Sequence, residues 1–268
     1  MSEAVQSVER AAAVLHALAE QHERGARLVD VATATRLSRS TAHRLLTALV
    51  QLGLAEQDPS SGSYYPGLAL LGLGAAAANR HNLTDLAAPF AQRLAERTGD
   101  TIYLAVRSGN DAVCVDRIEG VFPIKVLTWN VGDRRPLGVS ASGLAIMSAL
   151  ADDEVARIVD ANAARVEALT GHDRAGVLGL VEQTRRNGYA FNAGYSAPGM
   201  AAVAVAVRGA RGEPFGSLCV AALAERLDSQ RRETVVRWLA DETEQLRQHL
   251  NAVTHGLTFP LLRRARPR

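Results

Sequence analysis

Residues 39–52 constrain the fold more than any other segment, because they carry two opposed stripes at helical spacing. One stripe is apolar and consists of Ala42, Leu45, Leu46 and Leu49. The other is polar and consists of Ser40, His43, Arg44 and Thr47. This pattern predicts an amphipathic helix with one buried side, ended by Gly53. No acidic residue occurs between Arg36 and Gln51, so the polar side suits a helix that enters the major groove of DNA. A solvated face of a small helical bundle is the alternative.

The neighbouring segments favour the DNA interpretation. A first helix is expected from the N-cap Ser7 to about Gly25, and a second over 29–35 before a tight break at 36–38. After Gly53, strands over 54–57 and 63–66 flank a turn-rich Asp-Pro-Ser-Ser-Gly segment. This order is typical of a winged helix-turn-helix whose third helix reads DNA. With Ser38 as helix cap, the predicted DNA-contacting residues are Arg36, Ser38, Arg39, Ser40, Thr41, His43, Arg44 and Thr47.

Charge limits how such a domain can bind. The 268-residue chain has a formal net charge of only +2, and residues 1–80 contain seven arginines and seven acidic residues. A neutral domain cannot hold DNA by bulk charge, so its few arginines must act locally. We therefore expect a dimer that binds a palindromic or repeated operator in double-stranded DNA.

The remainder of the chain predicts a second, α+β domain. Helical periodicity over 68–98 indicates a helical linker. Strands are then expected over 101–107, 112–119, 124–130, 189–192, 200–207 and 215–222. Helices are expected over 142–150, 153–160, 174–187 and a final stretch that carries Val235 and Leu250. Short connections favour an antiparallel sheet with flanking helices over 99–255, and the arginine-rich tail at 256–268 is expected to be disordered.

Several classes of function lack support in the sequence. Cys114 and Cys219 are far apart, and no His, Cys or carboxylate cluster has metal-ligand spacing, so neither a metal nor a cofactor is expected. The longest apolar run, 68–78, is too short to span a bilayer. The N-terminus does not resemble a secretory signal. We expect a cytoplasmic protein with no membrane partner and no catalytic residues.

The chain resembles the IclR (isocitrate lyase regulator) family of bacterial transcriptional regulators. The likeness lies in Val5–Ala11, in the helix-turn-helix string Ser40-Thr41-Ala42-His43-Arg44-Leu45-Leu46, in Gly132–Ala145 and in Gly188-Tyr189-Ala190. It implies a winged helix-turn-helix over 1–67, a linker helix over 68–98 and a GAF-like effector-binding domain over 99–255. One departure is Arg36, where the family often has glycine in the turn. We expect strain there, because arginine adopts a left-handed conformation at some cost.

The resemblance also implies an effector pocket between the sheet and the helix that follows Pro136-Leu137. The residues that it assigns to this pocket are Ser140, Ala141, Ser142, Gly143, Asn192, Met200, Ala202, Cys219 and Ala221. From the residues alone, a helix cap with close packing is the favoured interpretation of the serines, and only the resemblance favours the pocket. Gly138 and Leu144 stand where the family commonly has His and Lys, so the hypothesis is a small organic effector that is aromatic or weakly polar.

The residues and the resemblance thus predict a ligand-responsive DNA-binding regulator of catabolic or related genes, with repression favoured over activation. The resemblance implies a homodimer or a dimer of dimers. One alternative is a small-molecule sensor that acts through a protein partner. Another is an enzyme that uses the second domain, although no nucleophile with a partnered base is evident.

Overall fold

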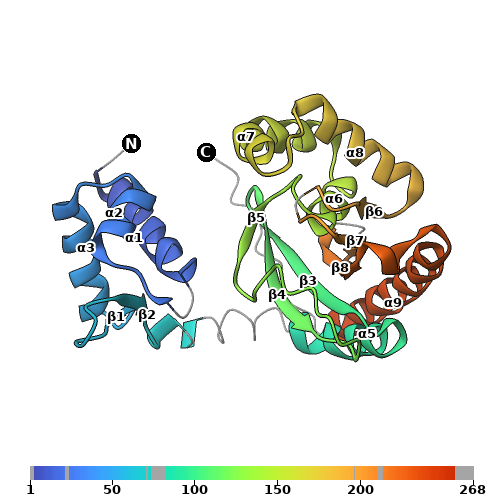
Figure 1. The fold of residues 1–268 in the computed structure, drawn as a ribbon, viewed down its shortest axis with the longest axis horizontal. Coiled ribbons are helices and arrows are strands. Elements are labelled where there is room, and N and C mark those ends of the chain that lie inside the picture. The colour runs from blue at the N-terminus through green and yellow to red at the C-terminus, as the bar shows by residue number, and fades with distance from the viewer. Residues whose placement is uncertain are drawn as a thin grey trace. The chain divides into compact units, whose positions relative to one another are not determined.

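The computed structural model describes residues 3–21, 24–70, 72–73, 83–195, 197–209 and 214–256 (Figure 1). The chain divides into two compact units, residues 1–82 and 83–268. The predicted tail beyond residue 256 lies outside the described residues, as does most of the predicted linker before residue 83.

The first unit is a three-helix domain with a small hairpin. Its elements are α1 (Glu3–Ala19), α2 (Leu28–Thr35), α3 (Arg39–Gln51), β1 (Ala55–Gln57) and β2 (Tyr64–Pro66). The two strands pair antiparallel, and Leu18, Val31 and Leu46 are buried between the helices. The predicted order of elements is confirmed. The predicted cap at Ser7 is wrong: α1 starts at Glu3, because nothing in Glu3–Gln6 interrupts a helix.

The second unit contains a six-stranded antiparallel sheet in the order β5-β4-β3-β8-β7-β6. The strands are β3 (Thr101–Ser108), β4 (Asp111–Ile118), β5 (Arg134–Pro136), β6 (Ala190–Asn192), β7 (Met200–Arg208) and β8 (Pro214–Leu223). The helices are α5 (Leu83–Thr98), α6 (Ala141–Ser148), α7 (Asp152–Thr170), α8 (Arg174–Asn187), α9 (Ser229–Gly256) and a 3₁₀ turn at Ala224–Leu227.

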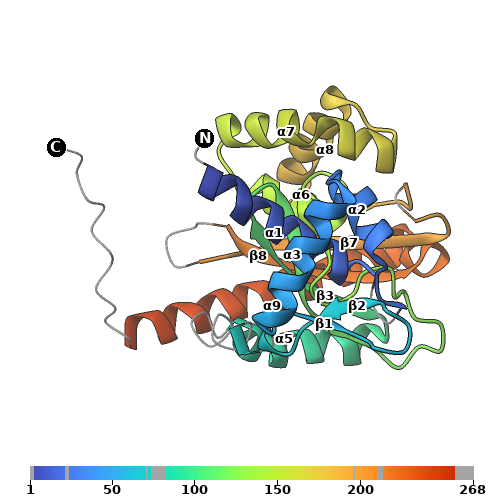
Figure 2. The same cartoon turned by 90° about the vertical axis from the view of Figure 1, so that its left-hand side faces the viewer.

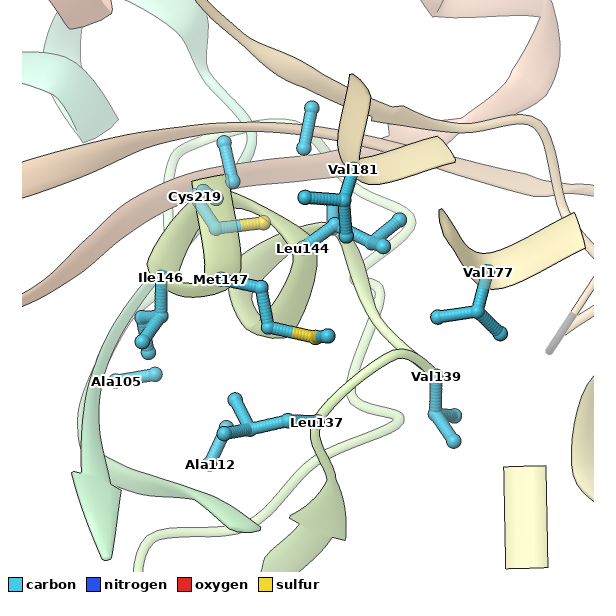
Figure 3. Packing of buried hydrophobic residues seen from close by; sticks show 14 of the residues in the cluster. Ala105, Ala112, Leu137, Val139, Leu144, Ile146, Met147, Val177, Val181 and Cys219 are labelled. Atoms are coloured by element: carbon cyan, nitrogen blue, oxygen red, sulfur yellow. The ribbon is translucent and has the colours of Figure 1, made fainter. Parts of the chain in front are cut away.

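Helices cover both faces of this sheet (Figure 2). On one face, α5 and α9 pack over Leu104, Val203 and Val220. On the other face, α6 lies over β7 and β8, and α8 packs on α6 (Figure 3). The alternation of β8 explains the two layers, since Leu218 and Val220 point to one core and Cys219 to the other. The α+β architecture predicted from the sequence is confirmed.

Two predicted elements differ from the structure. Residues 124–130 form no strand; Pro123 precedes them, and Ile124 and Leu127 are exposed. On the edge of β4 away from β3, the paired strand is instead β5, whose Arg134 lies opposite Val113. The helix predicted over 153–160 extends ten residues further, to Thr170, before Gly171 ends it in a left-handed conformation.

The segment predicted as a linker falls on both sides of the division between the units. Its second half is α5, which is packed against α9 rather than standing alone. Leu94 is fully buried, and Arg93 donates hydrogen bonds to the buried Glu242 of α9 at 2.7 to 3.2 Å. These contacts place α5 in the core of the second unit.

Candidate functional site

Helix α3 presents the predicted polar stripe to solvent. Ala42, Leu46 and Leu49 are buried, and Leu45 is half-buried against the same core. The exposed side carries Ser40, His43, Arg44 and Thr47, with Arg36, Ser38 and Arg39 exposed just before it, whereas Thr41 is half-buried. Among the described residues, no carboxylate lies within ion-pair distance of these arginines. The stripe is therefore positive and unobstructed within this unit.

Several hydroxyls of the stripe already serve the helix itself. Ser38 is the N-cap: its Oγ accepts a hydrogen bond from the Thr41 N–H at 3.1 Å and lies 2.8 Å from the Thr41 hydroxyl. The Thr47 hydroxyl donates to the His43 carbonyl at 2.9 Å. The side chains best placed to donate to DNA are thus His43, Arg44 and Arg39, beside the N-terminal amides of α3.

The turn between α2 and α3 contains the strained residue that the sequence predicted. Arg36 has φ 54° and ψ 33°, and no other non-glycine described residue has a positive φ. The Leu37 N–H donates back to the Ala32 carbonyl at 3.0 Å, as in a Schellman motif. This geometry fixes the angle between the two helices at a position that favours glycine.

The β1–β2 hairpin carries no positively charged side chain. Residues 54–66 contain no lysine or arginine. At its tip, the Asp58 carboxylate accepts hydrogen bonds from the Ser60 N–H, the Ser60 hydroxyl and the Ser61 hydroxyl, and these lower the pKa of Asp58 to about 2. The wing therefore bears a permanent negative charge, so cationic phosphate contacts must come from the helices.

In the second unit, one pocket lies between α6 and the sheet. Its empty space, including the part open to solvent, is about 460 Å³. Eight of the nine predicted effector residues line it: Ser140, Ala141, Ser142, Asn192, Met200, Ala202, Cys219 and Ala221. They come from four separate segments of the chain, so the tertiary structure brings them together.

The ninth predicted residue, Gly143, does not line the pocket. Its N–H donates to the Ser140 Oγ at 3.1 Å, so Ser140 caps α6. Ser140 therefore both caps α6 and lines the cavity.

Sequence reasoning missed a third wall of the pocket, formed by aromatic and cationic residues. Tyr103 on β3 and Trp129 in the 119–133 loop line it. Their polar ends are satisfied elsewhere: the Tyr103 hydroxyl donates to the Val126 carbonyl at 2.6 Å, and the Trp129 indole N–H to the Asp133 carbonyl at 3.1 Å. Both residues thus offer apolar rings to a ligand. The available signal was a large aromatic residue within the segment 124–130 that was predicted as a strand.

Sequence reasoning also missed Arg135, which gives a positive charge to a pocket that was expected to bind a weakly polar ligand. Its guanidinium lies over the Trp129 ring at 5.1 Å and donates to the Thr128 carbonyl. Burial lowers the pKa of Arg135, although an arginine remains charged at neutral pH. No carboxylate is among the lining residues. The pocket therefore combines aromatic walls with one positive charge.

Cys219 faces this pocket as a protonated thiol. Burial raises the pKa of Cys219 to about 12, and that of Cys114 to about 12 as well, so neither is a ready nucleophile. Within the described ranges, no group of three metal-ligating side chains could hold an ion. Across the same ranges, every helix is too short or too polar to cross a bilayer.

Comparison with known proteins agrees with both halves of the structure. Residues 7–59 match the IclR helix-turn-helix domain, and residues 75–248 match the bacterial transcriptional regulator IclR C-terminal domain. The chain is 28% identical to the HTH-type transcriptional regulator XynR of Escherichia coli over 96% of this chain and 98% of that protein. It is also 28% identical to the HTH-type transcriptional repressor AllR of E. coli, covering 84% of this chain and 83% of AllR.

A solved structure shares the fold. It is an IclR homologue from Microbacterium hydrocarbonoxydans, complexed with 4-hydroxybenzoate, with a TM-score of 0.73 and 23% identity over 92% of this chain and 99% of that one. The family matches together cover most of the sequence, and the α3 stripe and the helix-covered sheet have the expected form. The chain belongs to the IclR family of bacterial transcriptional regulators, and it is a regulator rather than an enzyme.

Proposed function

We propose that this chain is a repressor that binds its operator through α3 as a dimer, and that a small aromatic carboxylate in the α6 pocket changes its affinity for DNA. The observation that carries the proposal is the composition of the pocket. Eight residues predicted from a family resemblance surround one cavity, and Trp129 and Arg135 complete it.

The chemistry of the lining supports this ligand class. A guanidinium donates in a fork that matches a carboxylate. The rings of Tyr103 and Trp129 match an aromatic body, and the thioether of Met200 adapts to its shape. The 4-hydroxybenzoate bound to the Microbacterium homologue belongs to this class, and the repressor name of AllR supports the direction of control.

DNA binding can be tested directly. Fluorescence anisotropy with DNA that flanks the gene of this protein, at two salt concentrations, would compare wild type with Arg44→Ala. The matched control is Arg186→Ala, which removes an exposed arginine from α8. We expect Arg44→Ala to weaken binding by at least tenfold and Arg186→Ala to leave it unchanged. Equal loss in both variants, or none, would favour a sensor that acts through a protein partner.

Effector binding needs a separate measurement. Titration of wild type with 4-hydroxybenzoate, benzoate and benzyl alcohol would separate the aromatic from the anionic requirement. We expect the two acids to bind and to release DNA, benzyl alcohol to bind much more weakly, and Arg135→Gln to lose at least tenfold affinity for the acids. Equal affinity for the alcohol and the acids would contradict the role of Arg135.

The size of the switch follows from linkage. An effector can shift DNA binding only by its differential affinity for the two states of the repressor. A tenfold to hundredfold difference corresponds to about 1.4 to 2.7 kcal/mol. One charge-assisted hydrogen bond that forms in a single state is of this magnitude.

A further inference from the structure

A buried hydroxyl without a partner lies beside the α6 pocket. It belongs to Thr101, the first residue of β3, which is 1% exposed. Its Oγ1 atom is buried and has no hydrogen-bond partner in the part of the chain that the structure describes. Such atoms are rare in folded proteins, because a buried polar group without a partner destabilises the folded state.

The strand register places this hydroxyl at the floor of the pocket. Thr101 lies two residues from Tyr103, so the two side chains share one face of the sheet. Thr101 is opposite Ala221 on the neighbouring strand. Ala221 is in turn opposite Ala202, which is opposite Asn192. These three residues and Tyr103 all line the pocket. Thr101 is therefore the fourth member of a row whose other members form the floor.

Within this row, Thr101 has the only polar side chain that is not already hydrogen-bonded. Ala221 and Ala202 carry methyl groups, which leave space above the sheet. The Asn192 carboxamide accepts a hydrogen bond from the Gly194 N–H at 2.8 Å and donates to a backbone carbonyl at 3.5 Å. A threonine hydroxyl can donate one hydrogen bond and accept others, so it can bind a hydroxyl or an amino group.

This hydroxyl is separated from the positive charge of the pocket. The Arg135 guanidinium lies 5.1 Å from the centre of the Trp129 ring, and that ring lies 6.0 Å from the Tyr103 ring. The charge is therefore next to the two aromatic walls. Thr101 lies about 7 Å further along β3 than Tyr103, because each residue of a strand advances about 3.4 Å. A benzene ring with a substituent at either end can bridge such a separation.

We infer that Thr101 is a specificity-determining residue of this pocket, and that it selects an aromatic acid with a hydroxyl or amino group at the end of the ring away from the carboxylate. The Thr101 hydroxyl forms a hydrogen bond with that group. Thr101 is not itself part of the lining, so the ligand group reaches it through a small movement of the floor at Ala221. The inference rests on the proposed function, since it requires an aromatic carboxylate in this pocket.

Calorimetric titration of the full chain with benzoate and 4-hydroxybenzoate tests the inference. Wild type should bind 4-hydroxybenzoate at least about fivefold more tightly than benzoate, because only the first acid can bond to Thr101. Thr101→Val removes the hydroxyl and keeps the shape of the side chain, so its affinities for the two acids should agree within about twofold. Thr101→Ser retains a hydroxyl and should keep the preference.

Ser217→Ala is the matched control. The Ser217 hydroxyl is also fully buried, and it too has no hydrogen-bond partner among the described residues. Ser217 lies two residues from Cys219 and therefore on the same face of the sheet. Its cross-strand neighbours Ala105 and Ala206 do not line the pocket. Ser217→Ala should therefore keep the wild-type preference for 4-hydroxybenzoate.

The outcomes separate this inference from the proposed function. If wild type binds neither acid, the proposed function fails and the inference fails with it. If wild type binds both acids but has no preference, or if Thr101→Val keeps the preference, the inference alone is overturned. Loss of the preference in Ser217→Ala would also contradict it, because any buried hydroxyl of the sheet would then have the same effect.

Discussion

Replacement of Arg36 by glycine should stabilise the first unit and weaken its binding to DNA at the same time. Arg36 has φ 54° at the end of α2. A non-glycine residue in the left-handed region costs about 1–2 kcal/mol. Glycine removes that cost but adds about 0.5–1 kcal/mol of unfolded-state entropy. The difference lies between about 0 and 1.5 kcal/mol, and we expect a net gain in the middle of this range, about 0.5–1 kcal/mol.

Hydrogen exchange of the full chain measures this gain locally. A stabilisation of 0.5–1 kcal/mol slows exchange through opening of the unit by about twofold to fivefold. The buried residues Ala42 and Leu46 of α3 report it, because both belong to the helix that follows the turn. Amides of the sheet in the second unit should exchange at the wild-type rate and serve as an internal control.

The affinity of the Arg36→Gly variant for DNA should fall. Arg36 is exposed and is predicted to contact a phosphate, so its removal should reduce the slope of log affinity against log salt by about 0.9 per subunit. Arg36→Gln is the matched variant: it loses the charge but keeps the strained backbone. It should show the same change in salt slope with no gain in protection. Faster exchange in Arg36→Gly than in wild type would refute the argument from backbone strain.

Two further predictions concern the second unit. Ser140→Ala removes the cap of α6 and should lower the free energy of unfolding by about 1–2 kcal/mol in urea denaturation. Ser142→Ala should lower it less, because Ser142 is not the cap. Equal losses in the two variants would show that the cap contributes little. Burial raises the pKa values of Cys114 and Cys219 to about 12, so the folded state favours the protonated thiols. The stability that this preference contributes is fully present below the usual thiol pKa of about 9 and is lost as the pH rises toward 12. The difference in unfolding free energy between wild type and a Cys114→Ala, Cys219→Ala variant should therefore be constant up to about pH 9 and change above it. The native thiols should also react slowly with a disulfide reagent at about pH 7.5.

The sequence alone determined the features that depend on local periodicity. The stripes of α3, the cap at Ser38 and the break at Arg36 each require only residues within one or two helical turns. The same holds for most strands of the second unit. Family resemblance added eight pocket residues from four segments, since a known arrangement supplies long-range proximity that periodicity does not.

The tertiary structure alone decided what depends on contacts between distant segments. Residues 124–130 look like a strand but form a loop, because β5 takes the pairing edge of β4. That loop carries Trp129 into the pocket, and β5 brings Arg135 beside it. Strand pairing and helix packing bring these residues together over long sequence separations. Such contacts cannot be predicted from a local pattern of side chains.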